Sequence, residues 1–126
     1  MPTDIKLIHA RDFVKATSYG ELDFETSKKA LTEIASTAAH LVDYEILLDI
    51  RKAQVRMSPI NLWYLAAELS KLGNAFSRKT AVLSPVEQFD AAAFFALCSK
   101  NRSLNVEAFT SFEEAINWLI EMELDT

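Results

Sequence analysis

Residues 79–85 (KTAVLSP) form a short apolar run closed by proline, which is typical of a buried β-strand. Residues 85–101 are rich in alanine and phenylalanine and predict a helix. Residues 104–109 (LNVEAF) alternate apolar with polar side chains, which predicts an edge strand. Residues 111–119 (SFEEAINWL) carry a serine and a glutamate at capping-box spacing and predict a last helix. Strand, helix, strand and helix in this order predict an α/β fold with a parallel crossover.

The first part of the chain shows the same alternation. Residues 5–10 and 13–19 are short and β-prone, and predict a hairpin that turns at residues 11–12. Asp23 or Thr26 predicts the start of a first helix, because either side chain can accept a hydrogen bond from a free backbone N–H. The apolar residues that follow recur at helical spacing; they are Ala30, Leu31, Ile34, Ala35, Ala38 and Leu41.

The middle of the chain adds a central strand and a second helix. Residues 44–50 form a continuous apolar run of strand length, as expected for a strand covered on both faces. Ser58 and Pro59 predict a helix start, since serine caps and proline needs no donor there, and Gly73 predicts the helix end. The expected order is ββαβαβαβα in a single domain that spans residues 1–126. The residues expected to be buried in the central strands are Ile46, Leu48, Ala81 and Leu83.

The composition restricts the class of protein. The 126 residues include 13 basic and 18 acidic side chains, so the formal net charge is −5. Such a chain lacks the basic footprint that sequence-independent nucleic-acid binding needs. No apolar run approaches the ~20 residues of a membrane-spanning helix, and the N-terminus lacks a signal-peptide pattern. We therefore expect a cytoplasmic protein without a nucleic-acid partner.

Residues that carry enzyme chemistry are sparse. His9 and His40 are the two histidines and Cys98 is the single cysteine, so the sequence has no Cys/His metal cluster and no internal disulfide. Cys98 lies in an apolar stretch and is expected to be a small core residue. Asp49 falls at the end of the predicted central strand, where polar residues are ordinary. We expect a non-enzymatic protein that holds no metal ion and no cofactor.

Short motifs at both ends of the chain resemble a known family. Residues 19–23 (YGELD) lead into a helix and then into residues 45–50 (EILLDI), and residues 109–119 (FTSFEEAINWL) lie near the end. In this order they resemble STAS domains, and the ending resembles their SpoIIAA-like bacterial branch. The resemblance implies a four- or five-stranded mixed sheet with helices mainly on one face. It also implies binding rather than catalysis.

Ser58 lies where the chain departs from the pattern of that family. Anti-sigma-factor antagonists of the family carry Asp-Ser-Ser-Gly where the second helix begins, and phosphorylation there switches partner binding. This chain has RMSPI at residues 56–60, so the serine alone is retained. A phosphate at a helix N-terminus is electrostatically favourable, which makes Ser58 a candidate phosphoacceptor. The interpretation that we favour is a structural N-cap.

Two adjacent aromatic residues are the strongest functional signal. Trp63 and Tyr64 lie about 130° from the centre of the apolar stripe of their helix, on opposite flanks, so we expect both to be partly exposed. The loop expected before this helix carries Arg51, Lys52 and Arg56. We expect the five residues to form one surface, in which the cations meet an acidic or phosphate group and the rings supply apolar area.

The third helix adds a further apolar surface. The residues expected to share its buried face are Ala91, Phe94, Leu97 and Cys98, with Phe89 and Phe95 away from the centre. The three alanines at residues 91–93 permit close helix approach or leave room for a guest molecule. Two hypotheses follow. The first is an interaction module that binds a protein partner or forms a homodimer. The alternative is a carrier or sensor of a nonpolar ligand that docks transiently on a membrane, since SpoIIAA-like proteins are similar in fold to the CRAL-TRIO lipid carriers.

Overall fold

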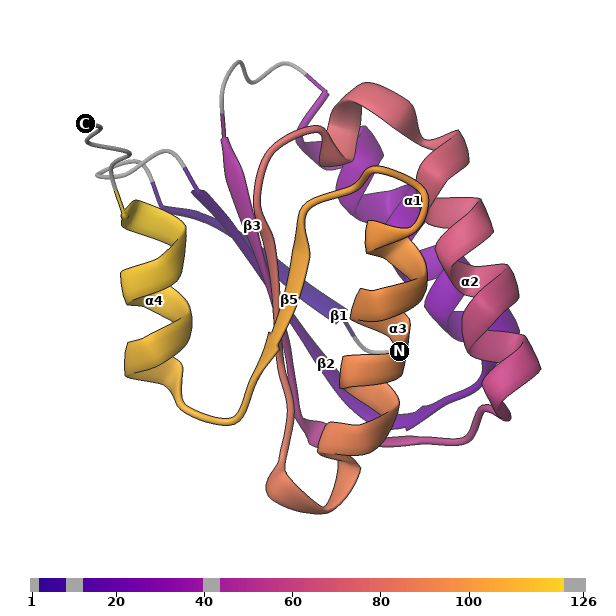
Figure 1. Ribbon diagram of the computed structural model, residues 1–126. Coiled ribbons are helices and arrows are strands. Elements are labelled where there is room, and N and C mark those ends of the chain that lie inside the picture. The colour runs from indigo at the N-terminus through magenta and orange to yellow at the C-terminus, as the bar shows by residue number, and fades with distance from the viewer. Residues whose placement is uncertain (1–2, 9–12, 40–43, 122–126) are drawn as a thin grey trace.

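The structure is a computed structural model that describes residues 3–8, 13–39 and 44–121. Its strands are β1 (Thr3–Ile8), β2 (Phe13–Leu22), β3 (Glu45–Val55), β4 (Thr80–Leu83) and β5 (Val106–Phe109). Its α-helices are α1 (Phe24–Thr37), α2 (Pro59–Lys71), α3 (Phe89–Lys100) and α4 (Phe112–Ile120). Short 3-10 helices span Gly73–Phe76 and Val86–Gln88. The predicted order ββαβαβαβα is confirmed (Figure 1).

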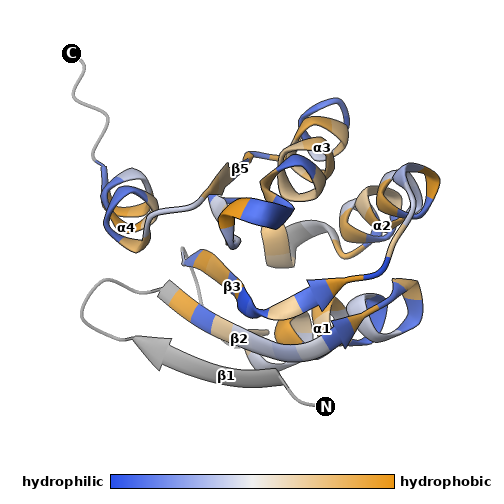
Figure 2. Cartoon of the chain, turned by 90° about the horizontal axis from the view of Figure 1, so that it is seen from below, coloured by the Kyte–Doolittle hydropathy of each residue, from blue (hydrophilic) through white to orange (hydrophobic). Residues whose placement is uncertain are grey.

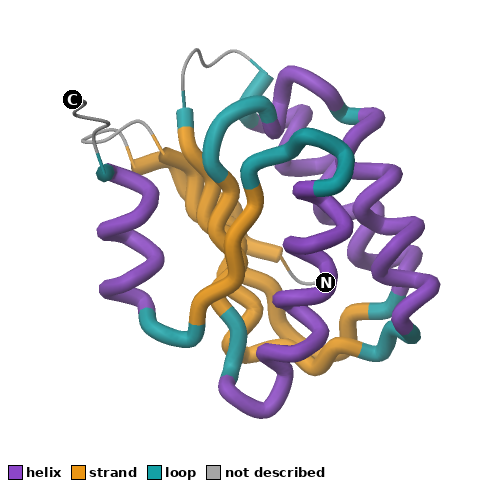
Figure 3. Tube along the Cα trace, in the orientation of Figure 1, coloured by secondary structure: helices purple, strands orange, loops and turns teal. Residues whose placement is uncertain are grey.

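The strands form one mixed sheet in the order β1-β2-β3-β4-β5. β1 pairs with β2 antiparallel, whereas the three pairings from β2 to β5 are parallel. Helices α1, α2 and α3 lie on one side of the sheet, and α4 lies on the other (Figure 1, Figure 3). The mixed sheet, the helices mainly on one face and the edge position of β5 are all as predicted. The turn expected at residues 11–12 lies outside the described residues.

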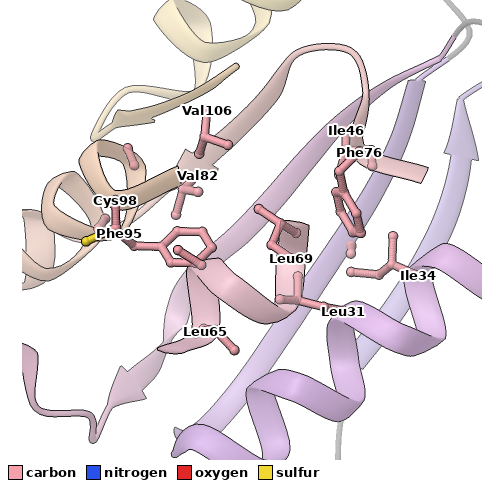
Figure 4. Close-up of a cluster of buried hydrophobic side chains, with 14 of the residues drawn as sticks. Leu31, Ile34, Ile46, Leu65, Leu69, Phe76, Val82, Phe95, Cys98 and Val106 are labelled. Atoms are coloured by element: carbon pink, nitrogen blue, oxygen red, sulfur yellow. The ribbon is translucent and has the colours of Figure 1, made fainter. Parts of the chain in front are cut away.

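Both faces of the central strands are covered by side chains. The larger core, between the sheet and α1–α3, includes Leu31, Ile46, Leu65, Val82 and Phe95 (Figure 4). The smaller core, beneath α4, consists of Leu47, Ala81, Leu83, Ala115 and Leu119. Successive residues of a strand point to opposite faces, so β3 and β4 must be apolar on both. Ile46, Ala81 and Leu83 are buried as predicted, and Leu48 is partly buried.

Side-chain caps fix where helices begin. Asp23 Oδ1 accepts a hydrogen bond from the N–H of Thr26 at 2.9 Å, and the N–H of Asp23 donates to Thr26 Oγ1 at 3.0 Å. Ser111 Oγ accepts from the N–H of Glu114 at 3.2 Å. Each bond satisfies an N–H group that a helix start leaves without an intrahelical partner. Leu41, which the spacing assigned to the first helix, lies outside the described residues.

β3 is longer than the sequence predicted. Residues 51–55 were expected to be a loop, but they continue β3 and pair with β2, where Lys52 lies beside Tyr19 and Val55 beside Leu22. The register shifts just before this segment, which marks a β-bulge. Arg51 and Lys52 are both exposed at the bulge and interrupt the apolar pattern, which concealed the extension even though Ala53 beyond them is buried.

Candidate interaction surface

Trp63 and Tyr64 lie on the outer side of α2. Trp63 is 46% exposed and Tyr64 is 52% exposed, as the helical spacing predicted. Their rings meet edge to face, with centroids 5.2 Å apart and planes at 86°. Ile60, which is 61% exposed, falls between them around the helix axis. The inner side of α2 buries Leu62, Leu65, Ala66 and Leu69 instead. The outer side therefore presents three large apolar side chains to solvent.

α3 presents a second pair of exposed apolar side chains. Phe94 is 37% exposed and Leu97 is 53% exposed. The predicted buried face of this helix was therefore wrong, and Phe95 belongs to the core. The sequence offered no single stripe to choose from, because the helix is apolar on most of its circumference. The residues that α3 does bury are Ala92, Phe95, Ala96, Cys98 and Ser99, so Cys98 is a core residue as expected.

The two exposed groups lie on neighbouring helices. These helices lie side by side in two views and pack against each other (Figure 1, Figure 2). The guanidinium of Arg102, just after α3, lies 4.9 Å from the centroid of the Trp63 ring. We call Ile60, Trp63, Tyr64, Phe94 and Leu97 the outer apolar face.

Arg51 points to the opposite face of the sheet. Its Nε and Nη2 donate to the two carboxylate oxygens of Asp49 at 3.0 and 2.9 Å. The guanidinium also lies 5.6 Å from the centroid of Phe112, the first residue of α4. Because α4 and α2 lie on opposite faces of the sheet, the structure does not bring Arg51 to Trp63 and Tyr64 (Figure 1).

Asp49 is a buried carboxylate rather than an ordinary polar strand end. It is 4% exposed and lies within β3, because the strand continues beyond it. Burial raises the pKa of Asp49, but the hydrogen bonds and charge of Arg51, aided by the charge of Lys15, outweigh burial and leave the pKa below its usual value. Asp49 is therefore anionic at neutral pH and serves as one half of an ion pair.

The remaining two predicted cations contact β2. The Lys52 ammonium lies 5.8 Å from the centroid of the Tyr19 ring. The Nε of Arg56 lies 3.5 Å from a carboxylate oxygen of Glu21, and both side chains are well exposed. The five predicted site residues thus do not form one cluster. The cation that does contact Trp63 is Arg102, which sequence reasoning missed because no local spacing links α3 to α2.

A cavity of about 80 Å³ lies between the sheet and α1, α2 and α3. Its lining comes from all three helices and from β2, β3 and β4. Ala91 and Ala92 of α3 are among these residues. Two of the three alanines thus adjoin the empty space, which is the arrangement that would leave room for a guest.

Among the described residues, no three His, Cys, Asp or Glu side chains are grouped so as to hold a metal ion. His9 and His40 lie outside the described residues. Burial raises the pKa of the Cys98 thiol, although the charge of Arg102 opposes this, so the reactive thiolate is disfavoured. Within the described chain, none of the helices combines the length and apolarity needed to span a bilayer.

Comparison with known proteins identifies the fold. No family model and no curated protein matches the sequence. An uncharacterised protein with a SpoIIAA-like fold from Shewanella loihica PV-4 is 17% identical, with a TM-score of 0.57 over 94% of this chain and 92% of that one. The anti-sigma factor antagonist SpoIIAA, in its unphosphorylated form, is 16% identical, with a TM-score of 0.56 over 96% and 100%. An anti-sigma factor antagonist from Mycobacterium paratuberculosis is 15% identical, with a TM-score of 0.58 over 94% and 92%.

The chain has the SpoIIAA-like fold. The resemblance predicted from residues 19–23, 45–50 and 109–119 is thereby confirmed at the level of architecture. The matches cover nearly the whole of both chains, so the likeness concerns the fold as a whole rather than one part of it. At these identities the likeness concerns the fold alone.

Within the SpoIIAA-like fold, Ser58 caps the start of α2. Its Oγ accepts a hydrogen bond from the N–H of Asn61 at 3.2 Å, and its own N–H donates to Asn61 Oδ1 at 3.3 Å. Pro59 follows as the first helical residue, and Ser58 is exposed. The predicted N-cap is confirmed. One solved SpoIIAA structure is of the phosphorylated form, which is a property of that protein.

Proposed function

We propose that this chain is a non-enzymatic interaction module that binds a protein partner through the outer apolar face. The observation that carries the proposal is the exposure of five large apolar side chains on two adjacent helices. Soluble monomers bury most such groups, and an exposed cluster of them is typical of a docking surface. The relatives in fold include anti-sigma factor antagonists, whose name implies action on another protein, and this supports the same class of function.

The outer apolar face has the composition of an interface centre. Tryptophan, tyrosine and arginine dominate binding energy at protein interfaces, and Trp63, Tyr64 and Arg102 lie together here. The edge-to-face contact and the overlying guanidinium restrict both rings before a partner arrives, which lowers the entropy cost of binding. A flat apolar segment of a partner, such as one side of a helix, would cover these rings.

The charges beside this face favour an acidic rim on the partner. Arg56 lies three residues before the first residue of α2, is 62% exposed in its side chain, and makes a long contact of 3.5 Å to Glu21. A well-exposed pair of this kind contributes little to stability, so Arg56 can exchange Glu21 for a partner carboxylate at small cost. Lys52 and Arg51 point away from the outer apolar face. We propose that they are peripheral contacts, which a partner reaches only if it extends beyond that face.

Two roles for Ser58 are compatible with this proposal. As a cap it orients α2 and hence the outer apolar face. As a phosphoacceptor it would place a negative charge at the start of the helix that presents Trp63 and Tyr64. We favour the cap. Stoichiometric phosphoserine at this position in protein from the native cell would establish the switch instead.

The test compares the loss of exposed aromatic side chains on α2 with the loss of one on α4. The double variant Trp63→Ala/Tyr64→Ala should lose the partner in affinity capture from native cells, with an unchanged far-UV circular dichroism spectrum. The control is Phe112→Ala, which removes an aromatic that is 42% exposed on the α4 side of the sheet. Capture that persists in the double variant would refute the site. Sedimentation of the purified protein tests whether the partner is a second copy of the chain. A dimer that is lost in the double variant would show that it is.

The alternative function is a carrier or sensor of a nonpolar ligand. The observation that favours it is the cavity beneath α1, α2 and α3, which lies on the inner side of the same helices. Native mass spectrometry of freshly purified protein distinguishes the two candidates. A co-purified small molecule supports the carrier, whereas a bound protein and no small molecule support the interaction module.

A further inference from the structure

The cavity beneath the three helices contains an unsatisfied hydroxyl group. Ser27 lies in the second turn of α1, is 7% exposed, and lines the cavity. Its Oγ has no hydrogen-bond partner among the described residues. Most buried polar side-chain atoms are paired, so an unpaired hydroxyl against empty space leaves a hydrogen-bonding group for a water or another bound molecule.

Ser99 shows how a buried helical serine is satisfied elsewhere in the molecule. Ser99 is fully buried in α3, and its Oγ donates to the carbonyl oxygen of Phe95, four residues earlier, at 2.9 Å. Thr32 of α1 makes the corresponding bond to Lys28 at 3.0 Å. Both hydroxyl groups thus donate to the carbonyl oxygen four residues earlier, which is a usual hydrogen bond for a serine or threonine within a helix.

Ser27 makes no such bond. The carbonyl oxygen four residues before it belongs to Asp23 and accepts a bond from the backbone N–H of Ser27 at 3.0 Å. The single hydroxyl proton of Thr26 is shared within the same cap, because Thr26 Oγ1 lies 2.9 Å from Asp23 Oδ1 and 3.3 Å from the carbonyl oxygen of Asp23. The Ser27 hydroxyl therefore remains an unused donor and acceptor beside the cavity.

The rest of the lining restricts the chemistry of a ligand. Beside Ser27 and Ser18, the described lining residues are apolar, with Leu48, Leu65 and Phe95 as representatives from β3, α2 and α3. No charged side chain is among them. A carboxylate or ammonium group placed here would be buried without a counter-ion, which is strongly unfavourable. The lining thus favours a neutral, mostly apolar molecule with one hydrogen-bonding oxygen.

The size and position of the cavity limit the ligand further. Its volume of about 80 Å³ is below the roughly 150 Å³ of an engineered apolar cavity that binds benzene, but the cavity is partly open to solvent, so it can hold an alkyl chain whose end extends through the opening. Leu22, Val55 and Met57 line it where β2 and β3 end, and this carboxyl edge is where α/β sheets usually bind ligands. Met57 follows β3 and has a flexible side chain, which can move aside as a chain enters.

We propose that this cavity binds a neutral alkyl molecule bearing one hydroxyl or carbonyl oxygen, with Ser27 as its hydrogen-bond partner. The alkyl chain lies against Leu31, Leu65 and Phe95, which extend from three different helices (Figure 4). The site is on the inner side of α2 and α3. It is therefore separate from the outer apolar face, and either proposal can fail without the other.

The test is a titration with 1-hexanol, followed by NMR of the methyl groups of the full chain. We expect saturable shifts in the methyl groups of Leu31, Leu65 and Met57. Hexanoate at neutral pH has the same chain but carries a charge, and should bind about tenfold or more weaker. Shifts that grow linearly without saturation, or equal binding of hexanoate, would overturn the proposal.

Two matched serine variants test the role of Ser27. Ser27→Ala should weaken 1-hexanol binding about tenfold without lowering the melting temperature of the ligand-free protein, because no protein hydrogen bond is lost. Ser99→Ala removes the bond to Phe95, so it should lower the melting temperature and leave the hexanol affinity unchanged. Undiminished affinity in Ser27→Ala would overturn the assignment. Ala91→Leu, which fills the cavity, should abolish binding; a folded Ala91→Leu protein that still binds would place the ligand elsewhere.

Discussion

The two faces of the sheet differ in what lies between the strands and the helices that cover them. Beneath α4 lies a small cluster of buried side chains around Leu47 and Leu83, and the Asp49–Arg51 ion pair lies on the same side. Beneath α1, α2 and α3, the larger core contains a cavity and the unsatisfied hydroxyl of Ser27. Stability alone favours close packing and paired polar groups. We therefore propose that the α4 face mainly supports the fold, and that the three-helix face is the one that binds.

Neighbouring leucines of β3 provide the largest test of this comparison. Leu47 is fully buried against α4, whereas Leu48 is partly buried and lines the cavity. Leu47→Ala should reduce the free energy of unfolding by about 3 kcal/mol, because it opens a new void among buried side chains. Leu48→Ala should cost about 1.5 kcal/mol, since less contact is lost beside an existing void. Urea unfolding of both variants measures the two values, and equal losses would remove the distinction between the faces.

The Asp49–Arg51 pair gives the next test, on the α4 face. Asp49→Asn should cost about 2 kcal/mol at neutral pH, because the amide cannot replace both charge-assisted bonds to Arg51. The pKa of Asp49 is lowered on folding, so its contribution is present above the unfolded pKa, near 3.8, and is lost as pH falls through the folded pKa. The difference in unfolding free energy between wild type and Asp49→Asn should therefore shrink in acid. A difference that stays constant down to the acid limit would show that the charge is irrelevant.

Two helix caps, one on each face, provide a smaller test. Ser58 caps α2 and Ser111 caps α4, each through a backbone hydrogen bond of 3.2 Å. Ser58→Ala and Ser111→Ala should each lower the free energy of unfolding by about 1 kcal/mol, because each leaves an N–H group without its partner. Partner binding should survive Ser58→Ala if the residue is only a cap. Loss of binding in a stably folded Ser58→Ala protein would revive its role as a phosphoacceptor.

The strands and helices with a clear apolar pattern could be predicted from the sequence. Where the apolar pattern is interrupted or continuous around a helix, the sequence did not show which side chains are buried. Residues 44–50 and 79–84 were recognisable as central strands because two covered faces require apolar residues throughout. The extension of β3 through Lys52 was not, since its exposed side chains follow no apolar period. On α3, Phe94 and Phe95 are chemically alike, so only the packing shows which one is buried.

In the candidate sites, too, features set within one helix could be predicted from the sequence, and features set by packing between elements could not. Helical spacing alone predicted that Trp63 and Tyr64 are exposed, because the angle between residues on one helix is fixed. The contact between Trp63 and Arg102 depends on how two helices pack, and the opposite direction of Arg51 depends on a strand in place of a loop. The unsatisfied hydroxyl of Ser27 could not be predicted from the sequence, because whether a helical serine bonds to a carbonyl depends on the side-chain conformation.

The two tryptophans provide the finest test, since each reports one face with little effect on stability. Trp63 is 46% exposed beside Arg102. Trp118 of α4 packs against Phe109, with ring centroids 5.6 Å apart, and its carbonyl oxygen accepts a bond of 2.7 Å from Lys79 Nζ. In the single-tryptophan variant Trp118→Phe, the emission of Trp63 should be red-shifted and readily quenched by acrylamide, because solvent reaches the ring. In Trp63→Phe, the emission of Trp118 should be bluer and better protected.

Addition of the protein partner should then shift and protect only Trp63, because the outer apolar face lies across the sheet from α4. Addition of 1-hexanol should leave the quenching of both tryptophans nearly unchanged, since the cavity lies on the inner side of α2. A Trp63 that is already blue-shifted and protected in the isolated monomer would make this ring part of the core, and the outer apolar face would lose its central residue. The three-helix face would then differ from the α4 face in its cavity alone.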